Sequence, residues 1–151
     1  MKYPLAETLP YKITQVTTAF NDIVSNWFDK NGASIPVYRA LVVLRDGKIR
    51  SLKELAQITD IEQSTLSRHV GSMMRSGLIT RHRPEENGRI VQIAITEKGN
   101  ALCNMLTPFV EELEATMLQG ISPDVAEDIK SALSQIKDNL NALREKLAAD
   151  A

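Results

Sequence analysis

Residues 51–70 read SLKELAQITDIEQSTLSRHV, and most of the fold prediction rests on them. Ser51 stands three residues before Glu54, an arrangement that caps a helix start because each side chain accepts a hydrogen bond from the other residue's backbone N–H. A short helix is therefore expected over 52–59. Asp60 follows at a position where aspartate tolerates the left-handed conformation of a tight turn. A second helix, polar and basic along one side, comes next, and two such helices joined by a tight turn predict a helix-turn-helix.

The chain changes its periodicity directly after this pair of helices. Residues 79–83 show the alternation of a strand, and residues 90–95 are mostly β-branched. Asn87 and Gly88 lie between them and favour a hairpin turn, because both residues tolerate positive φ. We therefore expect a two-stranded β-hairpin with arginines on its strands and at its tip. A hairpin in this place makes the predicted fold a winged helix-turn-helix.

Apolar residues at steps of three and four predict further helices on both sides of this motif. A helix of about 20 residues is expected to end near Asn31, a second to run from Ser34 to about Asp46, and a third to start after Thr96. Ser122 is the start signal of a last helix of about 25 residues. The predicted fold class is thus mainly α with a small β-hairpin wing, flanked by N- and C-terminal helices.

The first and last of these helices carry apolar stripes that need burial. The last stripe has the spacing of a coiled-coil seam, on a helix that would overhang so small a domain. We therefore expect these stripes to form a dimer interface; the alternative is an antiparallel pairing of the two helices within one chain. The residues predicted for this interface are Ile13, Val16, Phe20, Ile129, Leu133, Ile136, Leu140, Leu143 and Leu147.

The composition excludes several classes of protein. The 151 residues suit one domain, and the single cysteine, Cys103, allows no internal disulfide, so a reducing cytoplasm is the expected location. The longest apolar run, residues 40–44, is far short of the ~20 residues of a membrane helix. No catalytic triad, metal-spaced cluster or phosphate-binding glycine loop is present, so we expect no enzyme, no metal and no cofactor. The five methionines, Met73 and Met74 among them, are interpreted as core filler.

The net charge is only −1, but the charges are unevenly distributed. Residues 39–89 contain ten Lys or Arg against six Asp or Glu, whereas the two ends of the chain are acidic. Within this segment, residues 63–84 contain four arginines, two histidines and no acid. A basic block that excludes carboxylates indicates a polyanionic partner, with a solvated basic surface as the alternative.

Four short segments carry a resemblance to a known family. They read SLKELA over 51–56, STLSRHV over 64–70, RSGLI over 75–79 and ITEKG over 95–99. Together they resemble the MarR family of bacterial transcriptional regulators, and the resemblance extends over nearly the whole chain. One departure is in the wing, where the family commonly carries Asp-x-Arg and this chain has Asn-Gly-Arg at 87–89.

The resemblance implies that different parts of the chain bind DNA and form the dimer. It implies a single MarR-like domain over 1–151, in which residues from about 34–98 form the winged helix-turn-helix lobe that binds double-stranded DNA. Residues from about 8–31 and 99–148 would form the helical dimerisation region. A two-fold dimer of this kind would place two recognition helices about one DNA turn, ~34 Å, apart on a pseudo-palindromic operator, and repression is the expected result.

Groove chemistry assigns roles to the polar side chains of this lobe. A helix in the major groove brings Ser, Thr, Arg and His to base edges, and Arg68 is the leading specificity residue because a guanidinium pairs well with guanine. Phosphate contacts add affinity without sequence information. The candidates for base readout are Ser64, Thr65, Ser67, Arg68 and His69. The candidates for phosphate and wing contacts are Ser51, Lys53, Arg75, Arg81, Arg83 and, in a minor groove, Arg89.

The resemblance also implies a small aromatic or phenolic acid that releases the DNA. The candidate residues for its site are Trp27, Phe28, Tyr38 and Arg39, with the arginine pairing a carboxylate. Two alternatives stand beside this hypothesis. One is a regulator that responds to oxidation of Cys103, although a lone helical cysteine is more often a small buried hydrophobe. The other is a winged-helix module that binds proteins and no specific DNA, against which the arginines of the wing argue.

Overall fold

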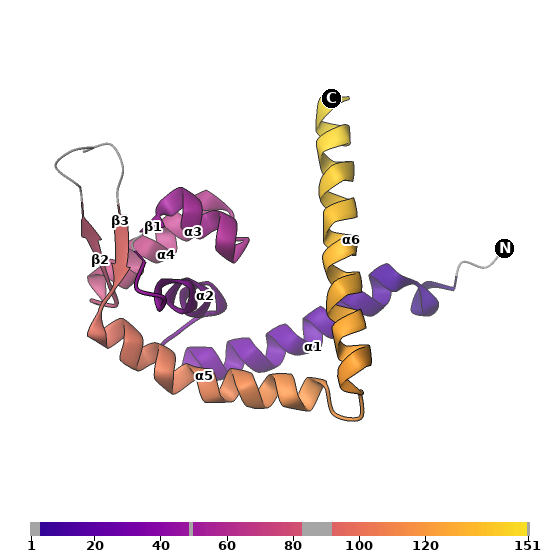
Figure 1. The fold of residues 1–151 in the computed structure, drawn as a ribbon, viewed down its shortest axis with the longest axis horizontal. Helices are drawn as coiled ribbons and strands as arrows, with labels where there is room; N and C mark the ends of the chain where they lie inside the picture. Colours follow the sequence, from indigo (N-terminus) through magenta and orange to yellow (C-terminus); the bar gives the residue numbers. More distant parts are fainter. Residues whose placement is uncertain (1–3, 49, 83–91, 151) are drawn as a thin grey trace. The chain divides into compact units, whose positions relative to one another are not determined.

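The computed structural model describes residues 4–48, 50–82 and 92–150. In chain order its elements are a 3₁₀ helix η1 (Leu5–Glu7), α1 (Leu9–Lys30), α2 (Ile35–Leu44), β1 (Arg50–Ser51), α3 (Leu52–Thr59), α4 (Gln63–Arg75), β2 (Ile79–His82), β3 (Gln92–Ile95), α5 (Glu97–Met117) and α6 (Pro123–Ala149) (Figure 1). The predicted class, mainly α with a small β wing, is confirmed. The chain divides into two compact units, the first ending at Thr107 and the second beginning at Pro108.

The helices α3, α5 and α6 begin at capping residues that the sequence indicates. Ser51 caps α3, and the hydroxyl of Ser122 accepts a hydrogen bond from the backbone N–H of Val125 at 3.4 Å at the start of α6. Before α5, the hydroxyl of Thr96 accepts from the backbone N–H of Gly99 at 3.1 Å. Each of these bonds satisfies a donor that the first turn of a helix leaves without an internal partner.

The sheet has three antiparallel strands in the order β1-β3-β2. β2 and β3 pair with Ile79 opposite Ile95 and Arg81 opposite Ile93, and β1 adds a pair between Arg50 and Ile93 on the other edge of β3. The sequence predicts only β2 and β3, because two residues are too few to show the alternation of a strand. The predicted turn at 87–88 lies outside the described residues.

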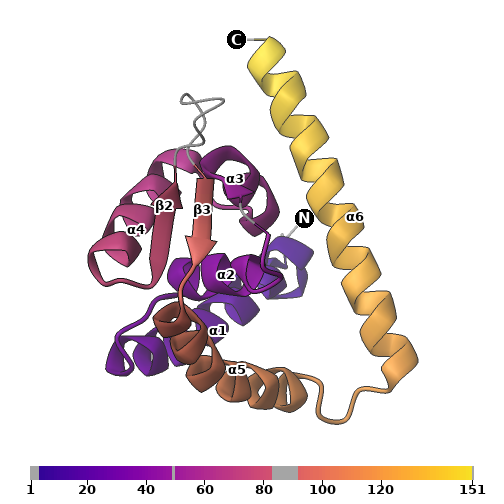
Figure 2. The ribbon, with the colours of Figure 1, turned by 60° about the vertical axis from the view of Figure 1, so that its left-hand side comes forward.

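The core of the first unit lies where α2, α3, α4 and the sheet meet. α3 and α4 pack against each other and on α2, and β2 packs against α4 (Figure 2). Apolar side chains supply most of the stability of such a contact, because burial removes them from water. The buried residues of this core are Ala40, Leu41, Leu44, Leu55, Ala56, Leu66, Val70, Met73, Leu78, Ile79, Ile93 and Cys103.

The interpretation of the methionines as core filler is only partly right. Met73 is buried on the inner face of α4, where Leu66 and Val70 precede it at helical spacing. Met74 is the next residue along the helix, so it points away from this face and is exposed. Met105 and Met117 on α5 are exposed as well, and for these three residues the interpretation is wrong.

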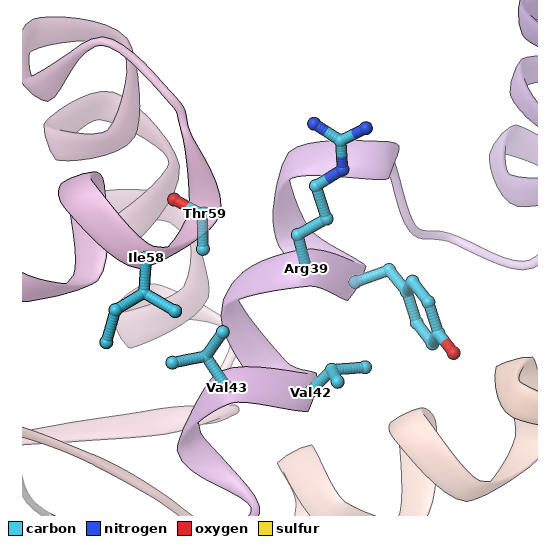
Figure 3. Close-up of a pocket in the computed structure, with 6 residues that line it drawn as sticks. Arg39, Val42, Val43, Ile58 and Thr59 are labelled. Atoms are coloured by element: carbon cyan, nitrogen blue, oxygen red, sulfur yellow. The ribbon is translucent and has the colours of Figure 1, made fainter. Parts of the chain in front are cut away.

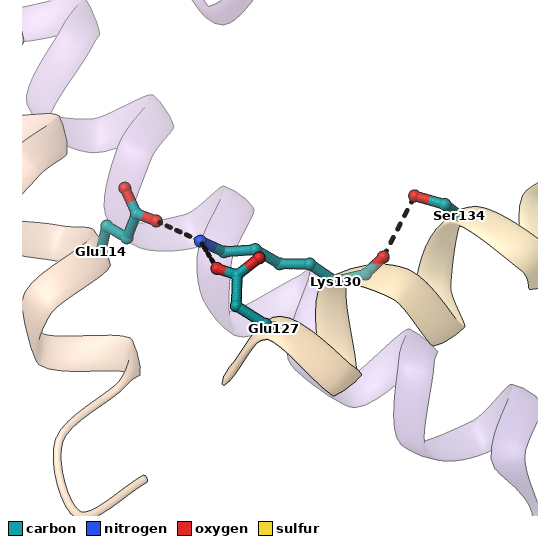
Figure 4. A network of polar contacts seen from close by, with 4 residues as sticks. All are labelled: Glu114, Glu127, Lys130 and Ser134. Carbon is teal, nitrogen blue, oxygen red and sulfur yellow. Dashed lines mark hydrogen bonds and ion pairs between the residues drawn. The ribbon is translucent and has the colours of Figure 1, made fainter. Parts of the chain in front are cut away.

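The second unit holds the end of α5 and all of α6. In it, the Nζ atom of Lys130 donates to Glu127 at 3.0 Å and pairs with Glu114 of α5 at 3.7 Å, while the hydroxyl of Ser134 donates to the Lys130 carbonyl at 3.1 Å (Figure 4). The hydrogen bond to Glu127 is the main reason that the pKa of Lys130 is raised. These ion pairs are exposed, so they contribute little to stability.

Candidate nucleic-acid interface

The first helix of the pair, α3, is anchored by its capping box. The backbone N–H of Ser51 donates to Glu54 Oε2 at 2.7 Å, and the backbone N–H of Glu54 donates to Ser51 Oγ at 3.2 Å. The first of these bonds is the largest cause of the lowered pKa of Glu54. At the other end, Asp60 has φ 56° and its backbone N–H reaches the carbonyl of Ala56. This left-handed residue makes the tight turn that the sequence predicts.

The second helix, α4, begins at Glu62, a carboxylate to which the sequence pattern assigns no role. Glu62 accepts hydrogen bonds from the backbone N–H groups of Ser64 and Thr65, each at 2.9 Å, and from the Ser64 hydroxyl. These bonds, that of the Ser64 hydroxyl above all, lower the pKa of Glu62 to about 2. The carboxylate is therefore ionised near neutral pH and stabilises the positive end of the helix dipole. The sequence feature that could have indicated this cap is a glutamate directly before the expected start of the second helix.

The residues predicted for base readout lie on the outer side of α4 or along its boundary. Ser64, Ser67 and Arg68 are exposed, whereas Thr65 and His69 are half-buried. The guanidinium of Arg68 donates to the hydroxyl of Thr65 at 3.2 Å, one turn earlier. The inner side of the same helix is held in the core, so the polar side chains project from a fixed support.

The predicted phosphate contacts that the structure describes lie on both helices of the motif and on the sheet. Lys53 is exposed on α3, Arg75 in the last turn of α4 and Arg81 on β2, whereas Ser51 is half-buried and occupied by its cap. The first unit therefore presents cations on both helices of the motif and on the sheet. Arg83 and Arg89 lie outside the described residues.

Arg50, a cation of β1 with no predicted role, is half-buried. Its guanidinium pairs with Asp46, and the Nε atom is buried with no hydrogen-bond partner among the described residues. Asp46 also accepts from the backbone N–H of Lys48 at 2.9 Å, and this bond is the largest cause of its lowered pKa. The guanidinium of Arg50 is therefore held by the turn that precedes β1.

Two of the four residues predicted for an effector line a pocket of about 280 Å³ between α2 and α3. They are Tyr38 and Arg39. Figure 3 shows Val43 of α2 pointing toward Ile58 of α3, while the guanidinium of Arg39 extends away from these apolar side chains. The pocket thus combines an apolar floor with a cation at its edge.

The other two predicted effector residues serve packing. The ring of Phe28 is 1% exposed and lies between two aromatic neighbours, 5.7 Å from the ring of Trp27 and 5.4 Å from that of Tyr38. Tilted ring pairs at these distances stabilise a core. Neither Trp27 nor Phe28 lines the pocket between α2 and α3.

The single cysteine is buried, as a small apolar residue would be. Cys103 is 0% exposed, and its Sγ atom accepts a hydrogen bond from Arg45 at 3.7 Å. The same guanidinium donates to the hydroxyl of Thr107 at 3.5 Å, one turn further along α5. The thiol is thus fixed between two helices. Among the described residues, no group of three His, Cys, Asp or Glu side chains could hold a metal ion.

Comparison with known proteins identifies the family. A family model described as MarR family matches residues 32–90. The organic hydroperoxide resistance transcriptional regulator of Bacillus subtilis (strain 168) is 31% identical over 118 residues, which are 78% of this chain and 77% of the relative. The chain belongs to the MarR family. It is therefore a DNA-binding transcriptional regulator, and the expectation that it is not an enzyme is confirmed by this membership.

The solved structures that share the fold of this MarR-family chain include BpsR and MepR. BpsR of Bordetella bronchiseptica, described as a protein whose DNA binding is regulated by 6-hydroxynicotinic acid, has a TM-score of 0.84 at 20% identity, over 91% of this chain and 99% of its own. MepR of S. aureus, in a complex with DNA, has a TM-score of 0.79 at 18% identity, over 88% of this chain and 96% of its own. In the described part of the chain, every helix is too short or too polar to cross a membrane.

Proposed function

We propose that this protein is a cytoplasmic, dimeric repressor that places α4 in the major groove of a pseudo-palindromic operator and is released by a small aromatic acid. The main support is the two-sided character of α4. Its inner side is fixed by Leu66, Val70 and Met73, while Arg68 and two serines project from its outer side. A rigid helix with an exposed guanidinium is what readout of a guanine requires.

Within this proposal, the roles divide by the group that each side chain can reach. Arg68 reads a base, and its bond to the Thr65 hydroxyl holds the guanidinium over the helix before DNA binds. Ser67 and His69 border the same surface, whereas Ser64 must first leave Glu62. Lys53, Arg75 and Arg81 contact phosphates together with Ser51 and Arg83, and the wing arginine Arg89 enters a minor groove. The ionised Glu62 close to Ser64 repels phosphates and thereby restricts the register of the helix on the operator.

The proposed dimer rests on the terminal helices. On α6, the predicted seam residues Leu133, Leu140 and Leu147 are 50%, 59% and 61% exposed in the single chain. On α1, Val16 is exposed too, and the residues that this helix buries in its own chain are Val24 and Phe28. Apolar side chains at heptad spacing that one chain leaves in water favour pairing with a second copy.

The proposed effector site is the pocket between α2 and α3. An aromatic ring would lie against Val42, Val43 and Ile58, and its carboxylate would pair with Arg39. Because α3 is the first helix of the DNA-binding pair, a ligand there acts directly on the position of α4. Oxidation of Cys103 is not part of this proposal, because the thiol is fully buried.

Fluorescence anisotropy tests the proposal by measuring the affinity of the protein for DNA. The labelled duplexes are a fragment of the protein's own promoter and a scrambled sequence, each at two salt concentrations. We expect a preference for the promoter, an affinity that falls with salt, and a loss of about 1–3 kcal/mol of discrimination in Arg68→Ala. Lys12→Ala, which removes one exposed cation from α1, is the matched control and should bind as wild type. Equal weak binding to both duplexes would contradict operator recognition and favour a protein-interaction module.

A further inference from the structure

The start of α4 carries an exposed carboxylate whose acceptor capacity is not exhausted. Oε1 of Glu62 accepts from the backbone N–H of Ser64, and Oε2 accepts from the backbone N–H of Thr65 and from the Ser64 hydroxyl. A carboxylate has about four acceptor positions on its two oxygens. One position on Oε1 therefore remains open to solvent, and a second opens if the Ser64 hydroxyl turns toward DNA.

Thr65 contacts both Glu62 and the arginine that the proposed function places on a base. Its backbone N–H donates to Glu62 at 2.9 Å, and its hydroxyl accepts from the guanidinium of Arg68 at 3.2 Å. Glu62 and Arg68 are both exposed, and in the described part of the chain they form no ion pair with each other. An acceptor and a donor of opposite charge are thus both available to DNA on the same side of the helix start.

The carboxylate of Glu62 is unsuited to the phosphate backbone. Backbone N–H groups at a helix start commonly bind phosphate, but Glu62 occupies those of Ser64 and Thr65. Its pKa of about 2 keeps it ionised near neutral pH, so that it repels a phosphate. When α4 lies in the major groove, the favourable partners for Glu62 are therefore the hydrogen-bond donors on the base edges.

The major groove presents such donors on two of the four bases. Cytosine presents its N4 amino group and no acceptor, whereas adenine presents its N6 amino group beside the acceptor N7. Guanine and thymine present acceptors, which an ionised carboxylate repels. Because Glu62 can only accept hydrogen bonds, cytosine is the base that fits it best and adenine is the next.

The carboxylate and the guanidinium are close enough to read neighbouring base pairs. Arg68 lies later in the helix, but its guanidinium reaches back one turn to Thr65, which is three residues from Glu62. Three residues of helix span ~4.5 Å, slightly more than the ~3.4 Å between successive base pairs. With α4 along the groove, the two groups face base pairs that are adjacent or separated by one.

We propose that Glu62 is a specificity residue that accepts a hydrogen bond from the N4 amino group of a cytosine in each half-site, within two base pairs of the guanine read by Arg68. Glu62 can reach a base only if α4 enters the major groove, so this role rests on the proposed function. The same side chain then caps the recognition helix and reads DNA.

Sequencing of the duplexes that the full chain selects from a randomised library tests this role. The wild type should enrich a cytosine in each half-site, and Glu62→Gln should replace it with adenine, because a glutamine amide bonds both N6 and N7 of that base. Glu62→Ser keeps a good helix cap without a carboxylate, so it should lose the preference at this position. The matched control is Glu54→Gln, which changes the capping carboxylate of α3 and should select the wild-type sequence.

Fluorescence anisotropy on the selected duplex separates base contact from capping. Replacing the cytosine by 2-pyrimidinone, which lacks the N4 amino group, should raise the Kd of the wild type roughly tenfold more than that of Glu62→Ser. Both proteins meet the same weakened base pair, so the difference between them reports the contact of Glu62.

Three results would decide against cytosine readout. If Glu62→Gln and Glu62→Ser select the same cytosine as the wild type, or if 2-pyrimidinone raises all Kd values equally, Glu62 is a cap only. If Glu62→Ser does not fold, as judged by circular dichroism, the change from cytosine to adenine in Glu62→Gln decides. A wild type that enriches no sequence at all would instead refute the proposed function, and readout by Glu62 with it.

Discussion

The helix-turn-helix and the last helix carry apolar stripes of the same periodicity, yet only the first stripe is buried. Leu66 on α4 is 0% exposed, whereas Leu140 on α6 is 59% exposed. The difference lies in the available partners, because α4 packs on α2, α3 and β2, while only Ala126 is buried among the described residues of α6. Periodicity therefore predicts which face of a helix will be buried. Whether one chain can bury that face, or a second copy is needed, depends on the elements that pack against the helix.

The largest expected effect comes from truncating the buried stripe. Leu66→Ala should lower the free energy of unfolding by about 3 kcal/mol, because it removes buried methyl groups and leaves a cavity that the helix-turn-helix cannot close. Urea unfolding at a fixed protein concentration measures this change in the free energy of unfolding. Leu5→Ala, at an exposed leucine, should stay within about 0.5 kcal/mol. Equal effects of the two variants would contradict the assignment of the core.

A charge on the exposed stripe should separate folding from association. Leu140→Asp should leave the far-UV circular dichroism unchanged but weaken the dimer roughly a hundredfold, because the interface would desolvate a carboxylate from each chain. Sedimentation velocity over a range of concentrations measures the change. Ser131→Asp, on the polar side of α6, is the control and should remain dimeric. A Leu140→Asp variant that sediments like the wild type would remove α6 from the proposed interface.

Signals between neighbouring residues explain why the helix-turn-helix could be predicted. The capping box of Ser51 and Glu54 and the left-handed Asp60 depend on residues within a few positions, and the structure has α3 over the predicted 52–59. β1 was missed because its two residues become a strand only by pairing with β3, about 40 residues later. The same limit applies to the hydrogen bond of Lys98, since it joins the side chain to the carbonyl of Ser76, 22 residues earlier.

The candidate site could be predicted only as a set of side chains. The sequence indicated which residues of α4 are polar, but it gave no sign that Arg68 bonds Thr65 or that Ser64 is held by Glu62. It also grouped Phe28 with Arg39, although Phe28 is buried against the rings of Trp27 and Tyr38 while Arg39 is exposed. Such differences arise from packing between helices, which residue type alone does not specify.

The smallest expected effect is a difference in pH dependence between the cap of α4 and the cap of α6. Glu62, which caps α4, has a pKa of about 2 in the folded chain against an ordinary value of 4.5, so its contribution to stability is fully present above about pH 4.5 and is lost as the pH falls toward 2. Ser122, which caps α6, has a hydroxyl that does not titrate in this range. Glu62→Gln should therefore flatten the fall of the urea midpoint between pH 5 and 3, whereas Ser122→Ala should lower the midpoint equally at each pH. If Glu62→Gln keeps the wild-type slope, other carboxylates carry the acid sensitivity of the helix-turn-helix, and the bonds from Ser64 and Thr65 do not persist in solution.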